Sequence, residues 1–170
     1  MVNFLHMGIE IERKFLVREM PIDISSQSPK IYERYYLDAS PDFEDRIQRI
    51  DNRYYREKKI RLSNLERTKE KEEISKEQFE LLKKNAGEVI LRESYFVSME
   101  PNISIKVYQG RFKPLVRAEV EFTAEDVAKK FTPLHWMGVE ITDSPLGKDS
   151  KLVHLSELEF GDLLNDEMSR

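Results

Sequence analysis

Two short segments that lie far apart in this sequence repeat the same alternation of glutamates with apolar residues. Residues 10–12 read Glu-Ile-Glu, and residues 119–121 read Glu-Val-Glu. Successive side chains of a β-strand point to opposite faces, so each segment would place two carboxylates side by side on one face. Carboxylate oxygens are the ligands that hard divalent cations prefer. One copy would be typical of a half-buried strand with a wet outer face, but two copies favour a metal site.

Basic residues share these carboxylate faces. Lys14 follows Glu10 and Glu12 at the same alternation, and Arg117 precedes the second glutamate pair. Lysine and arginine side chains bind phosphate oxygens through charge-assisted hydrogen bonds. A face with charges of both signs cannot form a packed apolar core, because buried unpaired charges are costly. If the strands close with these faces inward, the pattern predicts an interior that holds water, ions and a charged ligand.

The elements that must position these side chains are short strands. Eight segments alternate apolar and polar residues and are rich in Ile, Val, Tyr and Phe, which is typical of strands. They are 8–18, 30–37, 44–50, 53–61, 67–74, 88–98, 102–109 and 115–123. An eight-stranded sheet that closes into a barrel has room inside for one small ligand. We therefore expect a mainly β protein of the α+β class, an eight-stranded antiparallel closed tunnel with a few flanking helices.

Three helices are expected between and after the strands. Ser75 with Gln78 three residues later is a capping-box signature, so a helix should begin at Ser75. A second short helix fits 124–131, with Thr123 as its N-cap. Leucines at helical spacing predict a third helix over about 149–158.

The length of the chain and its composition limit the domain count. The chain has 170 residues, 39% of them apolar, which is enough for one domain with a sizeable core. We expect a single domain over 1–170, with its core over about 8–158 and mobile ends at 1–7 and 161–170. The sequence starts with no basic leader and has no run of membrane-spanning length. A cytoplasmic protein without a membrane partner is expected, and a homodimer is left open.

The charge balance and the missing residue types exclude several kinds of site. The 28 basic residues nearly cancel the 32 acidic ones, and the net charge of -4 argues against a protein that binds nucleic acid through bulk charge. The sequence has no cysteine, which excludes disulfides, thiolate zinc sites and a cysteine nucleophile. Its three histidines are widely separated and show no ligand spacing. Any metal would therefore bind to oxygen.

The ordered set of motifs resembles the CYTH family, also called triphosphate tunnel metalloenzymes. Residues 10–14 are similar to that family's Glu-x-Glu-x-Lys signature, and residues 118–122 resemble its late Glu-x-Glu strand. Similarity continues through 43–48, the family's Arg-x-Arg strand, through a lysine at the end of the next strand, and through 131–143. The motifs cover about residues 8–152. The resemblance implies a tunnel that binds a triphosphate with its cations and a divalent metal, Mg²⁺ or Mn²⁺, with its carboxylates.

By position, the resemblance implies which residues bind the metal and which face the phosphates. The metal group is Glu10, Glu12, Glu119 and Glu121. The phosphate group is Lys14, Arg46, Lys59, Arg67, Arg92 and Lys148. Lys58 competes with Lys59, because a slip of one residue would turn the other side chain to the opposite face. Arg67 fits a family arginine, but the carboxylates that should follow it, Glu70 and Glu72, are out of register by one.

Several positions depart from the family pattern. The second arginine of Arg-x-Arg is Gln48 here, and an arginine expected two residues after Arg92 is Ser94. An acidic residue expected on the seventh strand is Lys106, a change that would weaken a nearby second metal. The Arg-Tyr pair of the C-terminal segment is replaced by residues 146–147, Leu-Gly. Lys106 and Arg117 are candidates to replace the missing phosphate cations.

The first functional hypothesis is a metal-dependent triphosphate hydrolase, with inorganic tripolyphosphate or an organic or nucleoside triphosphate as substrate. Glu12 or Glu121 is the candidate general base, and Lys14 would neutralise charge at the reacting phosphate. A class IV-type adenylyl cyclase, which makes cyclic AMP from ATP, is one alternative. A tunnel that binds polyphosphate without turning it over is another, and a β-barrel interaction protein with no small ligand is the plainest.

Overall fold

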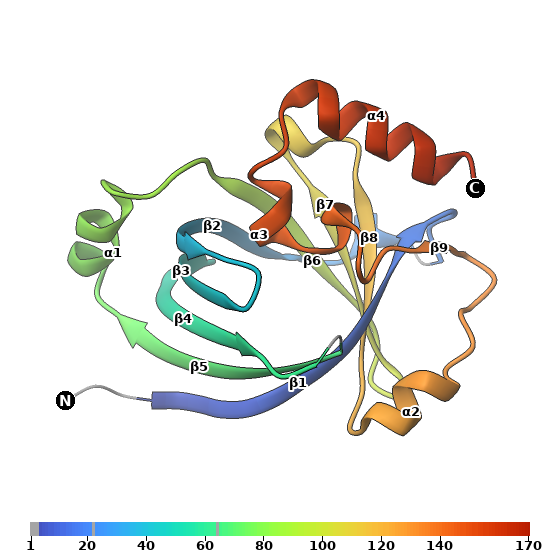
Figure 1. The fold of residues 1–170 in the computed structure, drawn as a ribbon, viewed down its shortest axis with the longest axis horizontal. Coiled ribbons are helices and arrows are strands. Elements are labelled where there is room, and N and C mark those ends of the chain that lie inside the picture. Colours follow the sequence, from blue (N-terminus) through green and yellow to red (C-terminus); the bar gives the residue numbers. More distant parts are fainter. Residues whose placement is uncertain (1–3, 22, 64) are drawn as a thin grey trace.

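The computed structural model describes residues 4–21, 23–63 and 65–170, whose strands form one antiparallel sheet (Figure 1). The strand order is β5-β4-β3-β2-β6-β7-β8-β1, and β1 also pairs with β5, which closes the sheet into an eight-stranded barrel. A ninth strand, β9 (Met137–Glu140), pairs with β1 outside the barrel. The closed antiparallel barrel that the sequence predicts is confirmed. Its strands are β1 (Phe4–Val17), β2 (Lys30–Ala39), β3 (Phe43–Ile50), β4 (Arg53–Arg61), β5 (Glu66–Ile74), β6 (Ile90–Ser98), β7 (Asn102–Tyr108) and β8 (Val116–Glu121).

All eight strands expected from the sequence are present, with ends that differ by a few residues. The largest difference is at the start of β1. Its backbone pairs with β5 from Phe4 onward, so residues 4–7 belong to the barrel although the sequence predicts a mobile end there. Residues 1–3 of that expected mobile end lie outside the described residues.

Short helices and turns connect the strands of the barrel. Helix α1 (Lys76–Lys83) has the capping box that the sequence predicts at Ser75 and Gln78. Helix α2 (Glu125–Lys130) has Ala124 as its N-cap without a side-chain cap, so the prediction of Thr123 is wrong. The 3-10 turns are η1 (Ile24–Ser26), η2 (Gly110–Phe112) and η3 (Pro145–Gly147). None of the helices in the described part of the chain has the length and apolar character needed to span a bilayer.

The C-terminal region differs from the expectation. Two helices, α3 (Asp149–Leu152) and α4 (Glu157–Met168), replace the single helix predicted over 149–158. Ser156 caps α4 with a capping box and so starts a new helix there. Residues 161–168 are helical, and Leu164 packs in the core, so the expected mobile tail is wrong for this stretch. Figure 1 shows α4 beside β7 and β8, on the other side of the molecule from α1.

The apolar core closes one end of the barrel and covers part of its outer face. One cluster joins Leu16 and Tyr108 to η3, α3 and α4 and includes Leu146, Leu152 and Phe160. A second cluster packs the outward side chains of β1, β7 and β8 against the segment before β9. Because the second cluster buries the outward apolar faces of β1, β7 and β8, the inward faces of the same strands are free to carry charge.

Candidate active site

The inward faces of the barrel strands form one charged cavity, which we call the tunnel. Eleven basic and seven acidic side chains line it, which leaves an excess of four positive charges inside a protein of net charge -4. The basic residues are Lys14, Arg34, Arg46, Lys59, Arg67, Lys69, Lys71, Arg92, Lys106, Arg117 and Lys148. The acidic residues are Glu10, Glu12, Glu44, Glu57, Glu119, Glu121 and Asp149. The expected mixed-charge lumen is therefore present, and it is basic overall.

Strands β1 and β8 bring the two Glu-x-Glu segments together. They pair antiparallel, so that Glu12 stands opposite Glu121 and Lys14 stands opposite Glu119. Burial and the neighbouring carboxylates of Glu12, Glu10 and Glu119 raise the pKa of Glu121 above its usual value. The four predicted metal ligands thus lie on two adjacent strands of one tunnel wall, where their negative charges repel.

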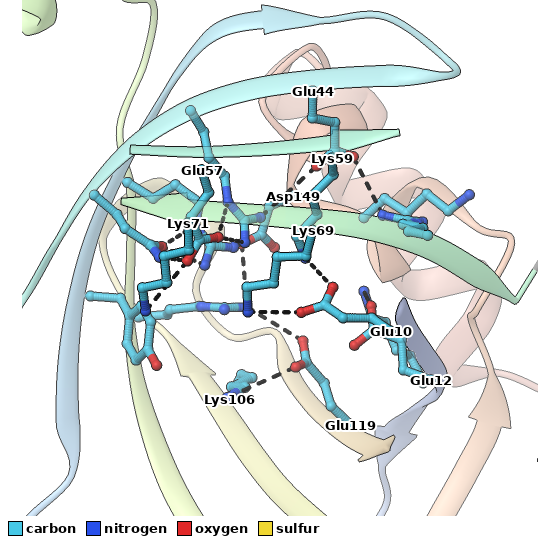
Figure 2. Close-up of a pocket in the computed structure, with 18 of the residues that line it drawn as sticks. Glu10, Glu12, Glu44, Glu57, Lys59, Lys69, Lys71, Lys106, Glu119 and Asp149 are labelled. Atoms are coloured by element: carbon cyan, nitrogen blue, oxygen red, sulfur yellow. Dashed lines mark hydrogen bonds and ion pairs between the residues drawn. The ribbon is translucent and has the colours of Figure 1, made fainter. Parts of the chain in front are cut away.

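Three of these four carboxylates bind cations of the tunnel. Glu10 accepts from Lys59 at 2.6 Å and contacts Lys69 at 2.8 Å, and burial opposed by these two lysines leaves its pKa far below the usual range (Figure 2). Glu12 contacts Lys14 at 2.9 Å, and Glu119 contacts Arg117 at 2.5 Å. The fourth, Glu121, accepts a hydrogen bond from Asn102.

The chemistry of the donor set fits a hard divalent cation. All four side chains offer carboxylate oxygens, which are the preferred ligands of Mg²⁺ and Mn²⁺. Burial raises the pKa of Glu121 most, and the carboxylates of Glu12, Glu10 and Glu119 raise it further, a negative charge that a cation would offset. No group of three or more His, Cys, Asp or Glu among the described residues is arranged to hold a metal ion. The carboxylates fit such an ion by type and by strand, and those of Glu10, Glu12 and Glu119 are turned toward lysine and arginine partners.

The tunnel contains every residue that the sequence predicted to face phosphate. Lys59 is buried and inward, whereas Lys58 is not among the lining residues, which decides between the two. On β5 the inward residues are Arg67, Lys69 and Lys71, so the glutamates between them point outward. This explains why Glu70 and Glu72 are out of register with the family pattern.

Lys148 and Arg67 form the least compensated part of the tunnel. Among the described residues, none forms a hydrogen bond or ion pair with the Lys148 ammonium, although this side chain is buried. Burial, together with Arg67, Lys151 and Arg61, lowers the pKa of Lys148 to about 8. Arg67 has one distant acidic partner, Glu44 at 3.5 Å. Two neighbouring cations with so little negative charge between them are suited to bind an anion.

Asp149 of α3 forms hydrogen bonds and ion pairs with side chains from several strands. Its buried carboxylate accepts from Tyr108 at 2.6 Å and contacts Arg34 at 2.7 Å, Arg92 at 3.2 Å and Arg117 at 3.2 Å. Burial opposes ionisation, but the three guanidinium groups hold its pKa well below the usual range. Asp149 therefore fixes arginines from β2, β6 and β8 at the end of the tunnel that α3 covers.

A second buried carboxylate binds side chains of the tunnel wall that β3, β4 and β5 form. Glu57 of β4 accepts from Arg46 and from Gln48, and it contacts Lys71 at 3.5 Å. Burial raises the cost of its charge, yet Arg46 and the nearby lysines keep its pKa well below the usual value. Arg46 is thus held in place before any ligand binds.

Several lining residues were not predicted as site residues. Glu44, Glu57, Lys69 and Lys71 follow the two-residue alternation from predicted neighbours on their strands, so that alternation could have found them. Arg34 lies between two inward tyrosines, Tyr32 and Tyr36, on a strand where no site residue was predicted. Asp149 carries no such signal, because it enters the tunnel from a helix.

Comparisons with known proteins agree with this geometry. An inorganic triphosphatase of Nitrosomonas europaea is 30% identical over 146 residues, which cover 84% of this chain and 95% of that protein. The crystal structure of an inorganic triphosphatase superposes with a TM-score of 0.61 at 28% identity and covers 89% of this chain and 98% of that one. A putative adenylate cyclase of Bacillus halodurans has a TM-score of 0.57 at 16% identity over 72% of this chain and 85% of its own, which shows a shared fold alone. No family model matches the chain.

Proposed function

The chain belongs to the CYTH family of triphosphate tunnel metalloenzymes, and on that basis we propose that it hydrolyses a triphosphate, with inorganic tripolyphosphate as the substrate. The observation that carries the proposal is the positive excess of the tunnel. Eleven basic against seven acidic side chains attract a polyanion into a protein that is acidic as a whole. Inorganic tripolyphosphate is preferred because the similar Nitrosomonas europaea protein is an inorganic triphosphatase.

The carboxylates of β1 and β8 would hold a divalent cation, Mg²⁺ or Mn²⁺. Their residues are Glu10, Glu12, Glu119 and Glu121. When bound, such an ion polarises phosphoryl oxygens and lowers the pKa of a coordinated water. Either Glu12 or Glu121, which face each other across the two strands, would take the proton of the attacking water.

The basic side chains would bind and orient the triphosphate. Lys148 and Arg67, which have little acidic compensation, would bind phosphate oxygens at the end of the tunnel near α3. Lys59 and Lys14 now bind Glu10 and Glu12, and they would neutralise charge that develops at the phosphate next to these carboxylates. Arg46 is held by Glu57 in a fixed orientation, which lowers the cost of arranging it around the substrate.

Measurement of phosphate release from tripolyphosphate, ATP, GTP and thiamine triphosphate, each with Mg²⁺, with Mn²⁺ and with a chelator, tests the proposal. We expect phosphate from tripolyphosphate with a divalent cation and none with the chelator. Tripolyphosphate binding by calorimetry without phosphate release under any of these conditions would instead identify a binding protein. Cyclic AMP and pyrophosphate from ATP would identify a cyclase.

A further inference from the structure

Two neutral residues occupy positions where the family pattern has arginines, and each lies directly opposite a cation of the tunnel. Gln48 of β3 is the cross-strand partner of Arg34 on β2. Ser94 of β6 is the cross-strand partner of Lys106 on β7. Directly opposite residues on one face of an antiparallel pair have neighbouring side chains. Each missing positive charge is therefore present one strand away.

The contacts of Arg34 orient its guanidinium within the tunnel. Its Nε and Nη2 both donate to Oε1 of Gln48, at 2.9 and 2.7 Å, and its Nη1 donates to Asp149 at 2.7 Å. The side chain is 4% exposed. Gln48 thus serves as a neutral acceptor that positions the arginine of the neighbouring strand.

Lys106 has the same relation to Ser94. Its Nζ donates to the Ser94 hydroxyl at 2.7 Å. Its nearest acidic partner, Glu119, lies 3.8 Å away (Figure 2). Here too a small neutral side chain accepts a hydrogen bond from the cation across the ladder. The two exchanges are independent, because they involve different strand pairs.

Both cations converge on one aromatic ring. The guanidinium carbon of Arg34 is 5.8 Å from the centroid of the Tyr32 ring, and the ammonium of Lys106 is 5.6 Å from it. Arg92, a predicted phosphate residue, is 5.1 Å from the same ring. Cations at such distances from a tyrosine face are attracted by the ring quadrupole. Three positive side chains from three strands therefore surround Tyr32.

The cluster around Tyr32 has unused binding capacity. It holds four cations, Arg34, Arg92, Lys106 and Arg117, and two carboxylates, Glu119 and Asp149, which leaves two positive charges in excess. In the described part of the chain, the buried Nε of Arg92 has no hydrogen-bond acceptor. An excess of charge together with an unpartnered buried donor indicates an anion in this place.

We propose that Arg34 and Lys106 supply from neighbouring strands the positive charges that residues 48 and 94 lack, and that with Arg92 they bind one phosphoryl group of the triphosphate beside Tyr32. The inference rests on the proposed function and adds a phosphate subsite to it. It also assigns Arg34 as a residue that contacts substrate.

An exchange of the two side chains tests the assignment. We measure tripolyphosphate affinity by calorimetry without metal, and KM and kcat for hydrolysis, in wild type, Arg34→Gln, Gln48→Arg and the double variant. Loss of one charge-assisted contact in Arg34→Gln should weaken affinity about 10- to 100-fold. The double variant, which returns the arginine to β3, should recover affinity to within about threefold of wild type. Arg49→Gln, which removes a guanidinium from the outer face of β3, is the matched control and should change neither value.

The outcomes separate this inference from the proposed function. If wild type binds and hydrolyses tripolyphosphate while Arg34→Gln binds equally well, the inference is wrong and the proposed function stands. If Arg34→Gln loses affinity and the double variant does not recover it, Arg34 only supports Asp149 and the inference is again wrong. If wild type does not bind tripolyphosphate, both are wrong. Should Arg34→Gln not fold, the exchange of Lys106 and Ser94 in Lys106→Ser/Ser94→Lys makes the same test.

Discussion

Glu12 of β1 and Glu121 of β8 stand directly opposite each other in the antiparallel ladder. Like charges in this relation destabilise a sheet. Burial and three carboxylates, of which Glu12 has the largest effect, raise the pKa of Glu121. The pair therefore costs stability in the metal-free protein, which is expected of residues that serve to bind a cation.

We predict that Glu121→Gln makes the metal-free protein more stable at pH 7, by up to about 0.5 kcal/mol because solvent screens the exposed Glu121 carboxylate, while it abolishes triphosphate hydrolysis. A carboxyl whose folded pKa is raised contributes its stability below its unfolded pKa and loses it as the pH rises through the folded value. The advantage of Gln should therefore disappear below the ordinary value of 4.5. Urea unfolding at pH 7 and pH 4 measures both effects. A less stable Glu121→Gln at pH 7 would contradict the prediction.

Glu10→Gln should remove a metal ligand. We expect Mn²⁺ affinity and tripolyphosphate hydrolysis each to fall by more than about 100-fold. Loss of a residue that only hydrogen-bonds to a metal ligand already lowers metal affinity or activity by up to that factor. Calorimetry with Mn²⁺ and a phosphate-release assay measure the two quantities. Glu70→Gln on the outward face of β5 is the matched control, since Glu70 does not line the tunnel. Unchanged Mn²⁺ affinity in Glu10→Gln would show that the metal assignment is wrong.

Asp149→Asn should destabilise the fold and increase its response to anions. Removal of one partner of a buried ion pair costs about 3 to 5 kcal/mol, because it leaves the arginines uncompensated. We expect a lower melting temperature and a larger stabilisation by tripolyphosphate than in wild type, because the anion replaces the lost charge. Thermal unfolding with and without tripolyphosphate measures both. Asp162→Asn on the exposed face of α4 should behave as wild type.

The affinity for tripolyphosphate should fall as the pH rises through about 8. Burial lowers the pKa of Lys148 to about 8, and Lys106 has the same value because of burial. Each lysine that loses its proton in the free protein can reduce affinity by up to about tenfold per pH unit. In Lys148→Arg the side chain stays charged, so the slope above pH 8 should decrease by about one. Calorimetric titrations of wild type and Lys148→Arg with tripolyphosphate at pH 7, 8 and 9 measure the two slopes. Protonation of tripolyphosphate itself affects both proteins equally, so it cancels when the slopes are compared. Equal slopes would contradict the assignment of Lys148 as a phosphate-binding residue.

The strands and most of their inward faces could be predicted from the sequence. A strand has a two-residue period, so one correctly placed side chain fixes the direction of its neighbours. This period placed the side chains of Glu10, Glu12 and Lys14 on one face of β1. It also placed Arg46 on the inward face of β3. On β5 the same period, counted from Arg67, leads to Lys69 and Lys71, which line the tunnel, whereas the carboxylates of the family pattern are out of register there.

The sequence by itself determined a charged barrel interior and its two kinds of side chain, because alternation within a strand is a local property. Tertiary structure alone decided which charges meet. The pairing of β1 with β8 sets Glu12 against Glu121, and the pairing of β2 with β3 sets Arg34 against Gln48. Asp149 reaches three arginines only because α3 covers the end of the tunnel. These contacts join residues far apart in the chain, and their register depends on how the whole sheet closes.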